Sequence, residues 1–101
     1  MSQFQIEKKN TETFEILGAL TFKTIDKAAL KLCRQKLQFS QQPIVIDLQK
    51  ITNADSAGLA LIIEWIKQAE QQQTPLSFQN IPQQLLALAK LSGFEHRLTT
   101  V

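Results

Sequence analysis

The sequence has few of the residues that build disulfide, metal or phosphate sites. Cys33 is the one cysteine among 101 residues, so neither an internal disulfide nor a zinc cluster can be expected. His96 is the one histidine, and no second imidazole or thiolate is close to it in the sequence. The three glycines, Gly18, Gly58 and Gly93, cannot form a glycine-rich phosphate-binding loop. The composition therefore predicts no metal and no cofactor.

Long apolar runs and an excess of one charge are also missing. The longest apolar run, residues 59–63, ends at Glu64 and is far short of the ~20 residues that cross a bilayer. Residues 1–9 are polar and lack the apolar segment of a secretory signal. Eleven basic and nine acidic residues give a net charge of +2, which does not favour nucleic-acid binding. We expect a cytoplasmic protein that associates with membranes only through a partner.

The apolar pattern that remains predicts a single α/β domain over residues 1–101. Apolar and polar residues alternate over 4–8 and 13–17, which predicts an antiparallel hairpin whose second strand ends at Gly18. Residues 43–48 form a nearly continuous apolar run, typical of a buried parallel strand. A further strand is predicted over 75–79, and residues 97–101 form a short final strand or an extended tail.

Helical spacing of apolar residues predicts three helices. The first begins at a Thr24 cap and ends near residue 39, the second follows Asp55-Ser56 and ends near residue 71, and the third begins at Pro82 and ends before Gly93. The order β-β-α-β-α-β-α implies an α/β fold with right-handed crossovers. We expect a mixed sheet of four to five strands and three helices.

The start of the second helix is the candidate functional site. Asp55 and Ser56 are both suited to cap a helix N-terminus, because their side-chain oxygens can accept hydrogen bonds from its free backbone N–H groups. Gly58 lacks a Cβ and allows another chain or a neighbouring strand to approach. Capping alone can account for the Asp-Ser pair, so its functional interpretation needs further support.

A resemblance to a known family supplies that support. The chain resembles STAS domains, which occur in anti-sigma-factor antagonists and sulfate transporters. Their central pattern is matched by Val45-Ile46-Asp47-Leu48, then Ile51, then Asp55-Ser56-Ala57-Gly58-Leu59-Ala60-Leu61-Ile62. The order of elements matches over nearly the whole chain. The resemblance implies a STAS fold and a domain that binds another protein and is not an enzyme.

The chain departs from the family in two places, at Ala57 and at Gly18-Ala19-Leu20-Thr21, where the family frequently has Gly-Glu-Leu-Asp. Antagonists typically carry the phosphorylated Ser or Thr directly before the glycine, where this chain has Ala57. The chain is more similar to the MlaB-type stand-alone STAS subunits of the maintenance-of-lipid-asymmetry transporter. That resemblance implies binding to the ATPase of an inner-membrane phospholipid ABC transporter. The alternative is an antagonist in a partner-switching phosphorylation circuit, with Ser56 as the regulatory hydroxyl.

Helical periodicity extends the expected protein-binding surface along the second helix. If Leu59, Ile62, Ile63 and Ile66 face the core, Leu61 lies on the far side and Trp65 on the flank. We expect an exposed Leu-Trp pair, because interface hot spots favour tryptophan. The alternative is that Trp65 packs beneath a loop or the tail. The predicted partner-binding residues are Asp55, Ser56, Ala57, Gly58, Leu61 and Trp65.

Overall fold

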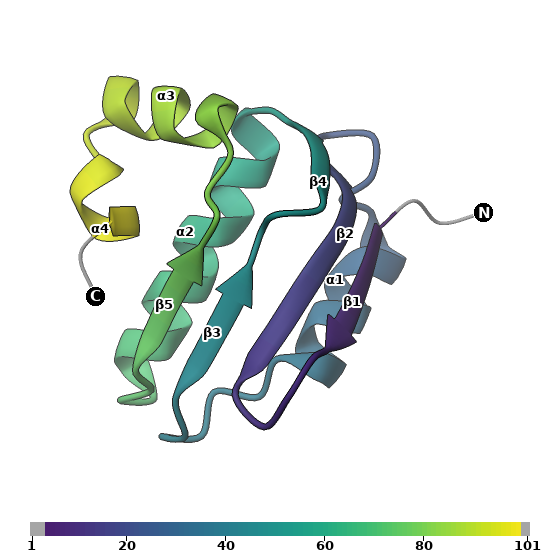
Figure 1. Ribbon diagram of the computed structural model, residues 1–101, viewed down its shortest axis with the longest axis vertical. Coiled ribbons are helices and arrows are strands. Elements are labelled where there is room, and N and C mark those ends of the chain that lie inside the picture. The colour runs from purple at the N-terminus through teal and green to yellow at the C-terminus, as the bar shows by residue number, and fades with distance from the viewer. Residues whose placement is uncertain (1–3, 100–101) are drawn as a thin grey trace.

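A mixed five-stranded sheet forms the centre of the protein, as a computed structural model of residues 4–99 shows (Figure 1). β1 (Phe4–Lys8) and β2 (Thr13–Leu20) form the predicted antiparallel hairpin. β3 (Ile44–Asp47) lies parallel to β2, and β5 (Leu76–Gln79) lies parallel to β3. The order along the sheet is β1-β2-β3-β5, which confirms the α/β class and its strand crossovers.

β2 is longer than predicted, because Gly18 bends this strand and does not end it. Gly18 has a φ of 97°, and the strand register shifts between Gly18 and Ala19, a bulge that glycine accommodates without strain. Before the bulge β2 pairs with β3, and from Gly18 onward it pairs with β4 (Ile51–Ala54). β4 was not predicted, since its exposed Thr52 and Asn53 give it no apolar pattern.

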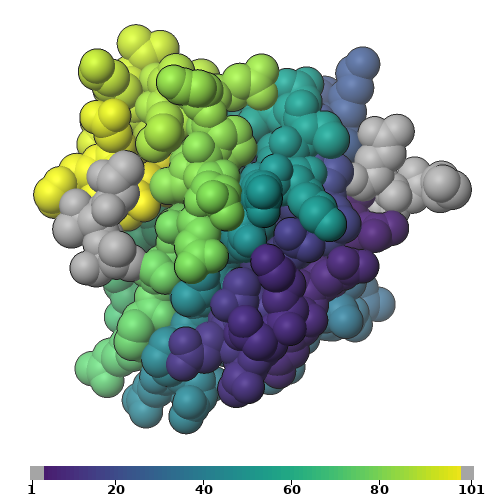
Figure 2. Space-filling view, in the orientation of Figure 1, coloured from purple at the N-terminus to yellow at the C-terminus, as the bar shows by residue number. Residues whose placement is uncertain are grey.

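Two long helices cover one face of the sheet. α1 (Lys27–Lys36) and α2 (Ser56–Gln71) lie behind the strands in Figure 1. The side chains of the strands themselves form much of the opposite face, which Figure 2 shows. Ile16 of β2, Ile46 of β3 and Ile62 of α2 are fully enclosed between these layers. Within residues 4–99, none of the helices has the length and apolar character of a membrane span.

The cap of the first helix differs from the prediction. Asp26 is its N-cap and accepts a hydrogen bond from the Ala29 N–H. Thr24 instead closes the preceding turn, where its hydroxyl donates to the Ala19 carbonyl. The helix ends at Lys36, earlier than expected, because the chain is extended at Leu37.

The C-terminal part contains one helix more than predicted. α3 (Gln83–Ser92) ends at the predicted Gly93 cap, which has a φ of 79°. α4 (Glu95–Thr99) follows, where the sequence predicted a strand or tail over residues 97–101. The reason is the four-residue spacing of Phe94 and the buried Leu98, which suits one side of a helical turn. Residues 100 and 101 lie outside the described part.

Candidate functional site

The Asp55 carboxylate joins two segments at the start of α2. Its Oδ1 accepts hydrogen bonds from the N–H groups of Ala57, at 2.9 Å, and Gly58, at 3.3 Å. Its Oδ2 accepts the Phe22 N–H at 3.0 Å, from the loop between β2 and α1. The Asp55 N–H in turn donates to the Leu20 carbonyl. Asp55 is therefore both the predicted helix cap and the residue that positions the neighbouring loop.

These contacts also determine the charge state of Asp55. The hydrogen bond from the Phe22 N–H, with those from Gly58 and Ala57, stabilises the carboxylate and lowers the pKa of Asp55 below its usual value, against the opposing effect of desolvation. The N-terminal end of the α2 dipole favours the same ionised form. Asp55 is therefore an anion at neutral pH whose oxygens are already committed within the fold.

Ser56 does not cap the helix. It is the first residue of α2, its side chain is exposed, and its hydroxyl makes no hydrogen bond within residues 4–99. The expectation that Ser56 shares the capping role is wrong, because the Asp55 carboxylate already holds the N–H groups of Ala57 and Gly58. Ala57 is half-buried beside it. Ser56 and Ala57 thus lie at the surface, where another molecule can reach them.

Gly58 allows α2 to approach the end of β2. A Cβ atom built on Gly58 would lie 2.3 Å from the Leu20 carbonyl oxygen and 2.9 Å from the Leu20 Cβ. Of the two predicted neighbours of Gly58, another chain or a strand of the same fold, the structure therefore shows the strand, β2. Gly58 itself is buried, so it shapes the site and offers no surface to a partner.

Phe22 is a surface residue that the sequence analysis did not single out. Its side chain is 80% exposed, although a hydrogen bond to Asp55 fixes its backbone. The loop that carries it projects from the edge of the molecule (Figure 2). An aromatic residue within the polar segment 21–24 is the signal that could have indicated exposure. Its proximity to Asp55 depends on the tertiary fold.

Leu61 and Trp65 are buried, so the expected exposed pair is wrong. Leu61 is 8% exposed and Trp65 is 2% exposed. Both line a cavity of about 260 Å³ beside α1, together with Leu30 and Cys33. The alternative of a buried Trp65 is confirmed, and the cavity places Trp65 beside α1 and beside Phe39 of the loop that follows α1.

Asp47 lies apart from this site and takes part in an ionic cluster. Burial alone raises the pKa of Asp47, but hydrogen bonds from the Asn80 side chain, the Gln49 N–H and the Lys9 ammonium outweigh it, so the pKa is lowered. Lys9 Nζ lies 3.1 Å from Asp47 and 3.9 Å from Glu15. Among residues 4–99, no group of three His, Cys, Asp or Glu side chains is placed to hold a metal ion.

The fold and the capped helix start define a STAS domain, and comparison with known proteins agrees. The family model described as "Mlab, STAS domain" matches residues 7–100. The chain therefore belongs to this STAS-domain family. No match is found among curated proteins.

A solved structure shares the fold. It is the anti-sigma-factor antagonist SpoIIAA in its unphosphorylated form, with a TM-score of 0.62 and 20% sequence identity. The similarity covers 95% of this chain and 85% of that chain. At this identity the similarity concerns the arrangement of strands and helices.

Proposed function

We propose that the chain is a non-catalytic STAS subunit that binds the ATPase of an inner-membrane phospholipid ABC transporter and supports its assembly and activity. Under this proposal it resides in the cytoplasm and reaches the membrane only through the transporter. The family match, whose description names Mlab, supports it. Ala57 also supports it, because a methyl group stands where antagonists typically carry the phosphorylated hydroxyl.

The observation that carries the proposal is the surface formed by Phe22, Ser56 and Ala57. Phe22 is 80% exposed, its backbone N–H bonds Asp55, and the exposed Ser56 follows Asp55 in the chain. Exposed aromatic residues are frequent anchors of protein interfaces, because they bury a large apolar area in the partner. Asp55 already fixes the backbone of the Phe22 loop, so binding loses less conformational entropy there. This docking surface replaces the Leu61–Trp65 pair that the sequence predicted.

Co-expression with a candidate ABC-transporter ATPase from the same genome tests the proposal. Phe22→Ala should remove most of the co-purifying ATPase, since truncating a hot-spot residue costs about 2 kcal/mol of binding or more. The thermal midpoint of the isolated variant should stay close to that of the wild type, because Phe22 contributes little buried area.

Leu91→Ala is the matched control for this experiment. Leu91 is 86% exposed, comparable to Phe22, and lies near the end of α3, which is the end of this helix away from α2 in Figure 1. The control should retain the ATPase. Equal retention by both variants, or equal loss from both, would contradict a docking surface centred on Phe22.

The antagonist alternative is favoured by one observation, the exposed hydroxyl of Ser56. A phosphate on this residue would lie in the first turn of α2, where the helix dipole stabilises negative charge. Under this alternative, incubation with a cognate kinase adds one phosphate to the wild type and none to Ser56→Ala, as intact-mass measurement would show. An unmodified wild type that still retains the ATPase supports the transporter subunit.

A further inference from the structure

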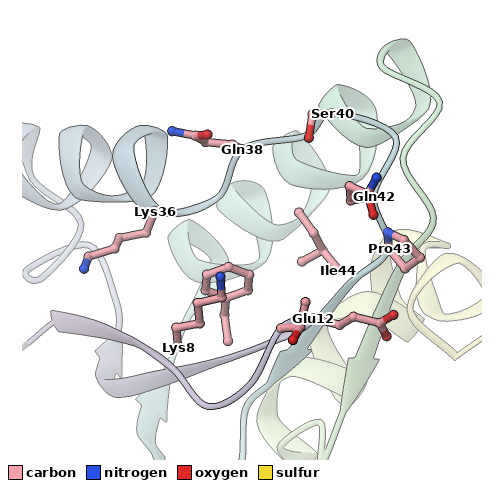
Figure 3. Close-up of a pocket in the computed structure, with 10 residues that line it drawn as sticks. Lys8, Glu12, Lys36, Gln38, Ser40, Gln42, Pro43 and Ile44 are labelled. Carbon is pink, nitrogen blue, oxygen red and sulfur yellow. The ribbon is translucent and has the colours of Figure 1, made fainter.

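A cavity lies at the opposite end of the sheet from the start of α2. It has a volume of about 420 Å³ and lies between the β1–β2 turn, the C-terminal end of α1 and the segment that leads into β3 (Figure 3). In Figure 1 this end of the sheet is at the bottom, whereas α2 begins at the top. A cavity of this size is within the range of small-molecule sites. The docking surface makes no use of it.

Two lysines without a carboxylate partner border the cavity. Lys8 of β1 places its ammonium group 5.8 Å from the centre of the Phe14 ring, and Lys36 is the last residue of α1. Neither forms a salt bridge within residues 4–99, whereas Lys9, next to Lys8 in the sequence, pairs with Asp47. The cavity therefore has two cationic groups that pair with no carboxylate in the described part of the chain.

The remaining lining combines an apolar floor with hydrogen-bond donors. Phe14 and Ile44 supply apolar surface, and the side chains of Ser40 and Gln42 supply a hydroxyl and an amide. Glu12 is the one carboxylate among the residues that line the cavity. Its carboxylate points away from the Lys8 ammonium in Figure 3. The lining suits a ligand with an anionic end and an apolar part.

Contacts within the fold hold both walls in place without a ligand. In the hairpin turn, Asn10 Oδ1 accepts hydrogen bonds from the N–H groups of Glu12 and Thr13. In the opposite wall, Gln41 has a φ of 74°, and its N–H donates to the buried Thr74 hydroxyl at 3.0 Å. A non-glycine residue held at positive φ carries backbone strain, which is more frequent near binding sites. The cavity is therefore a preformed shape.

We propose that this cavity binds a small organic phosphomonoester. The phosphate carries close to two negative charges at neutral pH, because its second pKa is about 6. Those charges match the ammonium group of Lys8, which lies over the Phe14 ring, and the Lys36 ammonium adds attraction from another part of the rim. Ser40 and Gln42 lie on the other side of the cavity in Figure 3, where they can bond polar atoms of the organic part. The organic part lies against Phe14 and Ile44. Two lysines without a carboxylate partner suit a phosphate, with close to two negative charges, better than a carboxylate with one.

Backbone amide NMR titration of the whole chain tests this proposal, with inorganic phosphate and phenyl phosphate as probes at constant ionic strength. Both should shift amides around the cavity, and phenyl phosphate should bind more tightly because its ring reaches the apolar floor. Lys8→Gln and Lys36→Gln should each weaken binding by about fivefold, and Glu12→Gln should strengthen it, from simple charge interaction energies at the surface. Binding should weaken from pH 8 to pH 5, as the phosphate loses one charge.

Lys31→Gln is the matched control, because Lys31 is exposed on α1 and does not line the cavity. Its affinity should equal that of the wild type. An equal loss in Lys31→Gln and Lys8→Gln, no saturable shift, or identical affinity for the two probes would overturn the proposal. Phosphatidylcholine vesicles that contain phosphatidic acid distinguish the ligand source. Vesicle binding that depends on Lys8 and is displaced by phenyl phosphate indicates a lipid headgroup, whereas binding of phenyl phosphate alone indicates a soluble ligand.

Discussion

Gly58→Ala is the substitution whose outcome the geometry determines most sharply. In a helix, alanine is normally more stable than glycine by about 1 kcal/mol. Here the added Cβ would lie 2.3 Å from the Leu20 carbonyl oxygen, far inside van der Waals contact. That carbonyl also accepts the Asp55 N–H, and Leu20 is fully buried. Neither side can move without breaking other contacts.

The expected result is therefore a net loss of stability. Overpacking of this kind costs about 1–3 kcal/mol, and a clash with backbone belongs at the upper end. After subtracting the helix-propensity gain, we expect Gly58→Ala to lower the free energy of unfolding by about 2 kcal/mol. For a domain of this size, that corresponds to a thermal midpoint lower by about 8–16 °C.

Urea unfolding measures this change directly, with the fluorescence of the single, buried Trp65 as the probe. Ala60→Gly is the control, because Ala60 is exposed in the same helix, and it should cost only the propensity difference of about 1 kcal/mol. If Gly58→Ala equals or exceeds the wild type in stability while Ala60→Gly behaves as expected, α2 does not contact β2 as closely as described.

Three further outcomes follow from burial and hydrogen bonding. Asp55→Ala should cost about 1–2 kcal/mol at neutral pH through loss of the cap, measured by urea unfolding. Trp65→Ala should lower the free energy of unfolding by about 3–5 kcal/mol, whereas Ser56→Ala should change it by less than about 0.5 kcal/mol. Comparable losses in the two variants would contradict a buried Trp65 and an exposed Ser56. Because the folded-state pKa values of Asp47 and Asp55 are lowered, their stabilisation is complete above the unfolded value near 3.9 and is lost as pH falls through the folded values. An Asp47→Asn, Asp55→Ala double variant should therefore lose less stability than the wild type in an acid titration followed by circular dichroism.

Local chemistry was sufficient to predict several elements and one part of the site. The alternation in residues 4–8 and the apolar run before Asp47 correspond to β1 and β3. Gly93 ends α3 as its position after an apolar helix indicated. Asp55 caps α2 through bonds to residues two and three positions away. The two helix caps depend on interactions between sequence neighbours, and the two strands are indicated by an apolar pattern within a few consecutive residues.

Other features depended on contacts between distant segments. β4 exists because the bulge at Gly18 redirects β2 toward a polar segment with no strand pattern of its own. The loop of Phe22 is held by the Asp55 carboxylate, far along the chain. The ionic cluster around Asp47 likewise brings Lys9 and Asn80 from opposite ends of the sequence.

The sequence by itself determined the α/β class, the capped start of α2 and the hydroxyl-free position at Ala57. It could not determine which face of α2 meets solvent, because the prediction from apolar spacing assumed that only one face of the helix is buried. In the folded protein α2 lies against the sheet and also beside α1, and this second neighbour encloses Leu61 and Trp65. Only the tertiary packing therefore decided that Phe22, and not Trp65, is the aromatic residue at the surface.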